Sequence, residues 1–563
     1  MQDEKKVIDR FLGDSQYPIE WAGEEEKALH FWVDDLHCPN PISPMWFDLG
    51  GWWTTCDYMY RRFGAPFGKE WVAKTVNGYV LSAVVPRDPQ EAAELAPYYA
   101  MVMPVYAAKF LGWWKERYLP EILRNFEYLD NFDMDNASLP ELMILLEDAL
   151  DIQERHFRLH WILNLAQFQS AFDFEKLLKE VIGESHAKLV GRILVSDEDR
   201  NWDSIRELWK MKERVKKSAT LKGAFDANNI GRLRQALSDS EEGREFLDDL
   251  KSFSREFGNK SIYSHEYISP TWREDSTPFL EALRGYVQTD YDYEGAVKKL
   301  RESRDAAISE MWSLFPPDRP EADRIRLQSA FDLALKMAPL TPDHHFYLDQ
   351  GTFARTRIVL MGVGRKLVES GVLAQADHIV FLKYHELRVI SANHSAFDAK
   401  ALVKERRTAR EAAFRLKPPS WAGTITEWSL YQEPYKSNWG WPDVYTNLVE
   451  SAKLPKKTLR GLGASAGTVE GPARLVESVE QFDQIQKGDI LVCKMTNPAW
   501  VLAFTKIGGL VTDSGGALSH PAVVSREFGI PAVVGTGKAT QQIKTGQRLR
   551  LNGSSGIVEI LGD

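Results

Sequence analysis

Two long stretches of the chain, 91–256 and 277–415, carry apolar residues three and four positions apart, which is the spacing of one buried face of an α-helix. Ser138 and Pro140 supply an N-cap and an early proline for one of these helices. Gly258 follows the end of another, at the position where a glycine commonly stops a helix. We therefore predict a large, mostly α-helical region.

The pattern changes after Thr458, where short β-type runs alternate with Gly and Pro turns. These runs are PARLVES, DILVCK, GGLVTD, PAVVG, GQRLRLNG and GIVEIL. With 563 residues the chain is too long for one ordinary domain. We predict a multi-domain protein with a mainly helical region over 1–417 and a compact C-terminal α/β domain over 458–563. The segment 418–457, rich in Trp, Pro, Tyr and Asn, is interpreted as a connector.

Composition and charge narrow the class of protein. The formal net charge is −10, which argues against a nucleic-acid-binding surface overall. The three cysteines have no metal-binding spacing. The N-terminal segment is charged and lacks an apolar core, and no apolar run approaches membrane-spanning length. We expect a cytoplasmic protein whose partners include neither nucleic acid nor membrane.

Tryptophan stands out in the composition, with 18 residues. Trp46, Trp52 and Trp53 gather in the segment PMWFDLGGWW. Such residues pack cores, and they also form the walls of pockets for flat apolar ligands. The pattern leaves both interpretations open, and the three residues are candidates for substrate binding.

The segment GGLVTDSGGALSHPAVVSREFG is typical of a strand, a glycine turn and a helix. Ser519 is a good N-cap and Pro521 follows it, so the helix should begin at His520 or one residue beside it. A phosphate near His520 would meet free helix N–H groups and the positive end of the helix dipole. The same positive end lowers the histidine pKa, which favours a neutral, nucleophilic imidazole. A capping histidine without chemistry is the alternative.

Other groups of this loop are expected to assist phosphate binding. Gly515 and Gly516 can adopt positive φ and leave backbone N–H groups uncovered. The hydroxyls of Thr512, Ser514 and Ser519 would point to the same place.

This loop resembles the signature of the phosphohistidine, or swivelling, domain of the PEP-utilising enzyme family. The matching residues are Thr512, Gly515, Gly516, Ser519, His520, Arg526, Gly529, Ile530, Pro531 and Ala532. The segment GLGASAGTVEGPARLV resembles the opening of the same domain. The resemblance implies that His520 is phosphorylated and that its domain swings between two sites, with Arg526 part of the phosphate loop.

A phosphohistidine needs a donor, and family members use an ATP-grasp domain or a PEP-binding barrel. We find neither pattern here, and GTGKAT lacks the first glycine and the final Ser or Thr of an ATP-binding P-loop. We expect a separate ATP-grasp-type subunit that uses ATP and Mg²⁺, while this chain binds no cofactor stably. The resemblance implies AMP and phosphate as the donor's products.

Three segments of the helical region resemble family members that phosphorylate small organic molecules, notably rifampin phosphotransferase and phenylphosphate synthase. They begin FWVDDLHCPNP, FGNKSIYSHEY and HHFYLDQGTFA. The third contains His345 and Asp349, four apart and so on one face of a helix, which is a recurring general-base arrangement. Arg355 and Arg357 are candidate phosphate ligands, although residues two apart cannot share a helix face.

Further candidates are Lys260, His385 and Glu386, each of which could equally be part of a surface ion pair or a capped turn. His156 and His160 have a spacing that can hold a metal. Because no third ligand is evident, we expect a packed pair and no metal.

The leading hypothesis is a phosphotransferase subunit that receives phosphate on His520 from its ATP-binding partner. It would pass that phosphate to the hydroxyl of a phenol or 4-alkylphenol, as the resemblance to split-subunit phenylphosphate synthases implies. Two alternatives remain. One is a rifamycin-like antibiotic phosphotransferase subunit, and the other is a non-catalytic phosphocarrier or regulatory protein with a helical docking scaffold.

Overall fold

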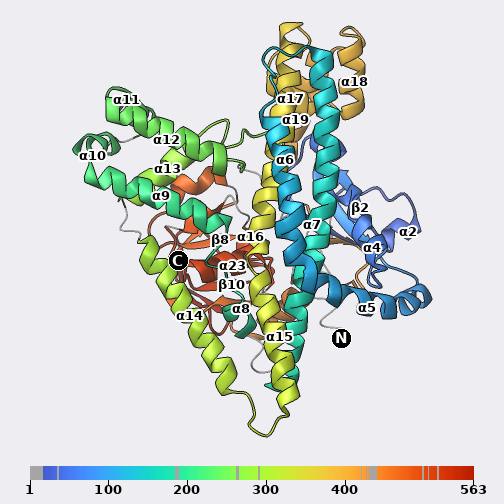
Figure 1. The fold of residues 1–563 in the computed structure, drawn as a ribbon, viewed down its shortest axis with the longest axis vertical. Helices are drawn as coiled ribbons and strands as arrows, with labels where there is room; N and C mark the ends of the chain where they lie inside the picture. Colours follow the sequence, from blue (N-terminus) through green and yellow to red (C-terminus); the bar gives the residue numbers. More distant parts are fainter. Residues whose placement is uncertain are drawn as a thin grey trace.

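The computed structural model describes residues 17–34, 37–183, 189–227, 229–261, 266–288, 292–416, 418–419, 421–426, 428–429, 440–477, 479–496, 500–504, 506–516 and 519–562. Long helices form the centre of the molecule, with a small sheet on one side and the C-terminal domain on the other (Figure 1). This arrangement confirms the predicted fold class, a large helical region followed by a compact α/β domain.

The central helices surround α7, which spans Leu139–Val181. The predicted start is confirmed: Ser138 and Glu141 form a reciprocal capping box and Pro140 lies in the first turn. The neighbours of α7 are α5 (Pro89–Trp113), α6 (Leu119–Asp130), α15 (Glu321–Met337), α16 (Leu340–His344), the π-helical turn η4 (His345–Gly351) and α17 (Thr352–Glu369). Beyond α17 lie η5 (Ala376–Phe381), α18 (Tyr384–Ala392) and α19 (Ala399–Ala413).

The N-terminal part of the helical region contains a sheet that the helical periodicity did not predict. Its strands are β1 (His30–Val33), β2 (Glu70–Val76), β3 (Tyr79–Val85) and β4 (Trp421–Gly423), in the antiparallel order β2-β3-β1-β4. The short helices α2 (Glu24–Lys27), α3 (Pro44–Leu49) and α4 (Asp57–Phe63) and the turn η1 (Trp52–Thr54) connect these strands. Because β4 comes from the segment expected to be a connector, part of that segment belongs to the N-terminal sheet.

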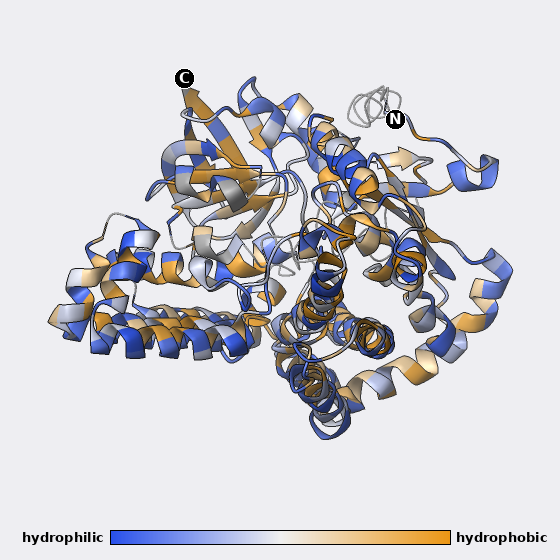
Figure 2. Cartoon of the chain, turned by 90° about the horizontal axis from the view of Figure 1, so that it is seen from above, coloured by the Kyte–Doolittle hydropathy of each residue, from blue (hydrophilic) through white to orange (hydrophobic). Residues whose placement is uncertain are grey.

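A side lobe packs beside the central helices and against the C-terminal domain (Figure 2). Its helices are α8 (Leu189–Ile193), α9 (Arg200–Lys217), α10 (Ala219–Phe225), α11 (Ile230–Ser238), α12 (Glu241–Phe257), α13 (Thr277–Gln288) and α14 (Tyr293–Ser313). Gly258 ends α12 as predicted. The long periodic stretch before it is divided, because Ser240 starts a new helix by capping the backbone N–H of Gly243.

The C-terminal domain is built on one sheet in the order β5-β12-β11-β7-β8-β9-β10-β6. Its strands are β5 (Thr458–Arg460), β6 (Leu462–Ser465), β7 (Thr468–Leu475), β8 (Ile490–Cys493), β9 (Gly509–Thr512), β10 (Ala532–Val534), β11 (Arg548–Asn552) and β12 (Ile557–Gly562). All six predicted runs are strands, and apolar residues from them belong to the buried clusters of the domain. The sheet carries the hydrophobic colour over much of its length (Figure 2). Strands β7 to β10 are parallel, so the ends of β8 and β9 lie at one edge.

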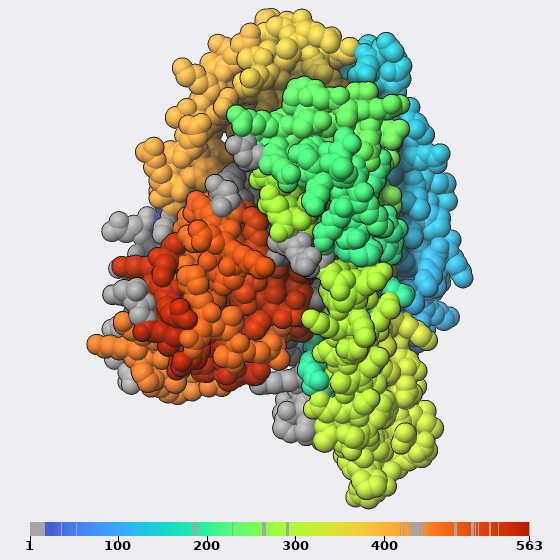
Figure 3. Space-filling view, turned by 90° about the vertical axis from the view of Figure 1, so that its left-hand side faces the viewer, coloured from blue at the N-terminus to red at the C-terminus, as the bar shows by residue number. Residues whose placement is uncertain are grey.

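Helices α22 (Val501–Phe504), α23 (His520–Glu527) and α24 (Ala539–Gln542) complete the domain, and η6 (Val479–Gln484) precedes β8. Helix α21 (Trp441–Lys453), from the end of the expected connector, packs against it, and Asn447 donates a hydrogen bond to the Gly535 carbonyl. The domain is seated against the side lobe (Figure 3). Among the described residues, no helix has both the length and the apolar character that a membrane crossing requires.

Candidate active site

The loop before α23 folds as the sequence predicts. Helix α23 begins at His520, with Ser519 as N-cap and a proline in the first turn. Gly515 has φ of +125°, and a Cβ atom there would lie 2.8 Å from the Ser519 hydroxyl oxygen, so the turn requires glycine. Gly516 does not use the left-handed region. Gly529, with φ of +63°, follows the helix end.

The loop hydroxyls shape this turn. Thr512 donates to the carbonyl of Ser514 at 2.7 Å, and Ser519 donates to the carbonyl of Gly516 at 2.7 Å. Both side chains are buried. Contact of these two hydroxyls with a phosphate therefore stays a prediction. Their hydrogen bonds to the backbone of the glycine turn are present in the structure.

His520 is held by a residue that the sequence analysis missed. Its Nδ1 lies 2.8 Å from the Thr496 hydroxyl oxygen. With the ring proton on Nδ1 donated to Thr496, Nε2 keeps its lone pair and is the nitrogen available for phosphate. Thr496 follows β8, whose end lies beside that of β9 because the two strands are parallel. That edge is where ligand sites of α/β sheets form, which is the signal that could have pointed to Thr496.

The pKa of His520 is lowered to about 3, chiefly by burial and further by electrostatic interactions with His345 and Lys260. The direction agrees with the prediction, but burial rather than the helix dipole is the main cause. The imidazole is therefore neutral at pH 7. The same interactions place His345 and Lys260, from two different parts of the helical region, close to His520.

His345 has the expected partner. Its Nδ1 lies 2.5 Å from a carboxylate oxygen of Asp349, within the π-helical turn η4. Asp349 is buried, and its other oxygen lies 2.8 Å from Nδ1 of His160 on α7. Burial opposes its charged form, but the two imidazoles outweigh this and hold the pKa of Asp349 well below its ordinary value. One ionised carboxylate thus positions two imidazoles.

Lys260 is the second group on the helical side. It is buried, and its ammonium lies 5.7 Å from the centre of the Trp272 ring. Burial lowers its pKa to about 8. A largely protonated lysine near His520 can stabilise the charge of a phosphoryl group during its transfer.

Both arginine candidates are engaged elsewhere. Arg355 binds Asp130 at 2.7 Å and lies 3.8 Å above the Phe126 ring, and burial lowers its pKa to about 10. Arg357 binds Glu274 at 3.0 Å and donates to the carbonyl of Tyr267. These contacts join η4 and α17 to their neighbours, so a role in phosphate binding stays a prediction.

The remaining candidates lie apart from His520. His385 is exposed on α18, at the far end of the central helices (Figure 1). Glu386 beside it pairs with Arg406 at 2.6 Å. Arg526 lies two turns along α23 from His520 and lines a groove facing α14.

The N-terminal tryptophans are part of the core. Trp46 is fully buried and packs edge-on against Tyr267 and Phe353, with ring centres 4.9 and 4.4 Å away. Trp53 packs against Phe47 at 5.3 Å. The Trp52 side chain lies outside the described residues.

One group of side chains could hold a metal. Ligand atoms of His160, His344 and Asp349 all lie within 4.8 Å of one another, and all three residues are buried. His344 donates from Nδ1 to the Leu340 carbonyl at 3.0 Å, which leaves Nε2 as a possible ligand. The pair His156 and His160 does not share this site, because His156 binds Thr352 instead. Since Asp349 already contacts His160 and His345, we assign the group to positioning of His345.

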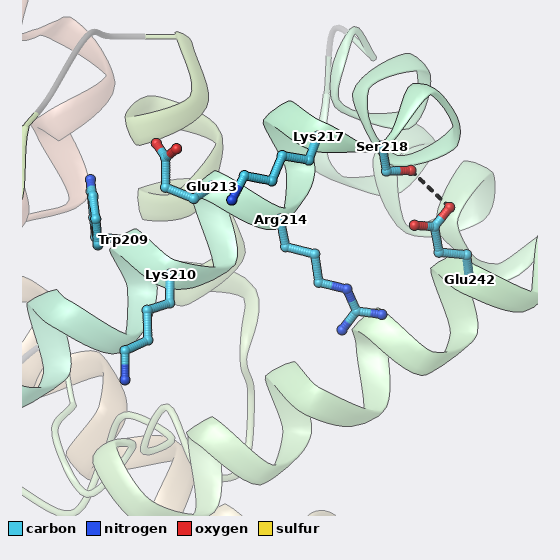
Figure 4. Close-up of a pocket in the computed structure, with 7 residues that line it drawn as sticks. All are labelled: Trp209, Lys210, Glu213, Arg214, Lys217, Ser218 and Glu242. Carbon is cyan, nitrogen blue, oxygen red and sulfur yellow. Dashed lines mark hydrogen bonds between the residues drawn. The ribbon is translucent and has the colours of Figure 1, made fainter.

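Two cavities lie near these helices. One, of about 240 Å³, is bounded by α4, β2, α5 and α7 and is lined mainly by aromatic rings. The other, of about 520 Å³, is an open hollow on the side lobe (Figure 4). In the hollow, Ser218 donates to Glu242, and Arg214 pairs with Asp249 outside it. It carries both signs of charge and lies away from His520.

Comparison with known proteins identifies the class. Residues 485–556 match the family model described as the PEP-utilising enzyme mobile domain, and residues 159–339 match that of the rifampicin phosphotransferase fourth domain. The first match confirms the resemblance to the PEP-utilising enzyme family seen in the loop around His520.

Similar proteins include several transferases. The chain is 29% identical to an uncharacterised phosphotransferase, YvkC, of Bacillus subtilis over 71% of this chain and 47% of that protein. It is 35% identical to rifampicin phosphotransferase of Streptomyces sviceus over 57% of this chain and 35% of that protein. It is 30% identical to the prodigiosin synthesizing transferase PigC of Serratia marcescens over 62% of this chain and 37% of that protein. The chain spans about half or less of the length of these relatives.

Proposed function

We propose that this chain is the phosphohistidine subunit of a cytoplasmic, ATP-driven phosphotransferase whose acceptor is the hydroxyl of a phenol or 4-alkylphenol. The observation that carries the proposal is that His345 and Lys260 of the helical region lie near enough to His520 to influence its pKa, while Asp349 holds His345. A phosphocarrier presented to a histidine–aspartate pair and a lysine has the base and the cation that transfer to a hydroxyl requires.

The first half-reaction loads His520. Nε2 attacks the β-phosphorus of ATP held with Mg²⁺ by an ATP-grasp-type partner, an N–P bond forms, and the P–O bond to AMP breaks. Water then cleaves the P–O–P bond of the pyrophosphorylated histidine, so that the terminal phosphate leaves and one phosphoryl group stays on Nε2. Thr496 keeps the ring proton on Nδ1 throughout. Family resemblance supports AMP and phosphate as the products left by the donor.

The second half-reaction delivers the phosphoryl group. The phenol oxygen attacks phosphorus, its proton moves to Nε2 of His345, and the N–P bond pair returns to Nε2 of His520. Asp349 stabilises the resulting imidazolium of His345, since Nδ1 already donates to its carboxylate. Lys260 stabilises the charge on the phosphoryl oxygens. The product is an aryl phosphate, and His520 returns to its neutral form.

A rifamycin-type hydroxyl is the second candidate acceptor. The matched fourth-domain model and one of the relatives bear the name rifampicin phosphotransferase, which favours it. A carrier without its own acceptor chemistry is the third possibility.

The test is reconstitution. The chain is mixed with an ATP-grasp-type subunit, radiolabelled ATP and, separately, p-cresol or rifamycin SV. We expect label on the chain, lost on addition of p-cresol with formation of aryl phosphate, and no label on His520→Ala. Transfer to rifamycin alone would favour the second candidate, and a labelled chain that serves no acceptor would favour the carrier. Full transferase activity in His520→Ala would exclude the mechanism.

A further inference from the structure

The cavity beside α7 has an unusual lining for a space inside a helical region. Its wall includes Tyr60, Trp71, Tyr99, Trp161, Phe168 and Phe172. Trp71 and Trp161 pack against each other with ring centres 5.1 Å apart. Aromatic faces and edges on several sides suit a flat aromatic ligand, because offset and edge-on ring contacts are favourable.

Two polar atoms in this wall have no acceptor. The indole N–H groups of Trp71 and Trp161 are buried, and neither finds a hydrogen-bond partner among the described residues. A buried donor without a partner costs about 1–3 kcal/mol. Neither indole nitrogen is reached by a water-sized probe, so these N–H groups do not face the cavity. The polar groups of the lining include the amides of Asn164 and Gln169. These amides suit a ring that carries an oxygen substituent better than a plain hydrocarbon.

Contacts connect the cavity to the proposed reaction centre. Trp161 packs edge-on against the His160 ring at 5.0 Å, and the Asn164 amide nitrogen lies 2.9 Å from Nε2 of His160. Nδ1 of His160 in turn contacts Asp349, which holds His345. Two residues of the wall thus touch the histidine that shares its carboxylate with the proposed base.

A second connection runs through Phe168. This residue lines the aromatic cavity and also a smaller cavity of about 50 Å³ that reaches Val523 on α23. Val523 lies one turn after His520. The two cavities therefore share the Phe168 side chain, and the smaller cavity reaches the helix that begins at His520.

The size of the cavity limits the ligand. About 240 Å³ is below the range of roughly 300–1,000 Å³ found for sites that bind drug-sized molecules. A single aromatic ring with a short substituent fits such a space. A macrocycle of the rifamycin class does not.

We infer that this cavity binds the ring of the acceptor, a single-ring phenol with a short alkyl substituent, and that Leu165 and Phe172 set the limit on substituent length. The inference rests on the proposed function for the acceptor class. It adds the place where the ring is held and the residues that select its size. Asn164 binds the oxygen, and the aromatic rings enclose the apolar part.

Leu165→Phe tests the cavity by filling it. Leu165 lines the cavity from α7 and is buried, so the added ring atoms occupy ligand space. We expect p-cresol binding to the full-length chain, measured by calorimetry, to weaken about tenfold or more. Ile144→Phe is the control, since it adds the same bulk to the same helix at a position that is 64% exposed. Equal binding by Leu165→Phe and wild type would overturn the inference.

Phe172→Leu guards against a folding defect in the first variant. By enlarging the cavity it should shift preference from 4-methylphenol toward 4-butylphenol by about tenfold in relative affinity. An unchanged preference would overturn the inference.

When His520 has been loaded by the donor, phenol binding and aryl phosphate formation are measured together. The two measurements distinguish a failure of this inference from a failure of the proposed function. Phenol binding that depends on the cavity, without aryl phosphate, would leave the inference standing and refute the proposed function. Aryl phosphate formed with unchanged kcat/KM in both variants would refute the inference and leave the proposed function standing.

Discussion

Replacing Asp349 with asparagine is expected to slow transfer from phosphorylated His520 to a phenol while leaving the loading of His520 intact. The carboxylate lies 2.5 Å from Nδ1 of His345 and 2.8 Å from Nδ1 of His160, and it is 1% exposed. An amide in its place can accept from one imidazole only and carries no charge to stabilise a protonated His345. Because the nitrogen side of the amide faces the other ring, the tautomer of that ring is no longer fixed.

The size of the effect follows from what is removed. Positioned general-base catalysis contributes about 10²–10⁴-fold, equivalent to about 3–5 kcal/mol of activation free energy. We expect the single-turnover rate of Asp349→Asn to fall within this range. Because the site is buried and water does not replace the lost charge, we expect a value in the upper part of this range.

The assay isolates the second half-reaction. The chain is loaded with labelled phosphate, freed of the donor subunit, mixed rapidly with p-cresol, and the decay of phosphorylated His520 is followed by quenching. Asp343→Asn is the control: its carboxylate is partly buried and accepts a hydrogen bond from the backbone N–H of Arg200, and burial raises its pKa to about 6. If Asp349→Asn and Asp343→Asn both transfer within about threefold of wild type, the assignment of His345 as base is refuted.

Three further predictions address the groups around the phosphocarrier. Thr496→Val should slow the loading of His520 about threefold to tenfold, because one hydrogen bond that fixes the ring tautomer is lost; an unchanged loading rate would contradict this role. Transfer by wild type should decline as pH rises through about 8, where Lys260 loses its proton, and Lys260→Arg should move this decline to higher pH; a pH profile identical in both would exclude the lysine. Phe528→Ala should raise the KM of the transfer half-reaction, in which phosphorylated His520 serves the phenol, and should leave the rate of loading unchanged. The reason is that Phe528 stacks on Trp202 of the side lobe, with ring centres 6.4 Å apart. Equal losses in both half-reactions would argue against a docking contact.

Local signals were sufficient for the parts of the site that lie within one segment. The start of α23 at His520 followed from Ser519 and the proline after it, and the His345–Asp349 contact followed from a spacing of four. The strands of the C-terminal domain followed from short β-type runs between turns. In each case the physical cause acts over a few residues, so it is visible in the sequence.

The missed features depend on long-range packing. Thr496 and His520 meet because β8 and β9 are parallel neighbours, and His160 reaches Asp349 because α7 packs against η4. The sheet near the N-terminus needs β4, which follows the central helices by hundreds of residues. No periodicity within a segment specifies which distant segment will complete it.

The charges at the domain interface favour docking of the phosphorylated His520 over docking of the free one. In the unloaded chain, the positive charge of Lys260 and the burial of His520 both favour a neutral imidazole. A phosphoryl group on Nε2 brings negative charge to the same place and is attracted by the buried ammonium of Lys260, whose own pKa burial has lowered. The loaded carrier should therefore dock on the helical region more tightly than the unloaded one, and loss of the phosphoryl group weakens the contact that delivered it. The Phe528→Ala variant can show this, because its docking defect should be smaller when His520 is loaded than when it is free; an equal defect in both states would mean that packing alone holds the two domains together.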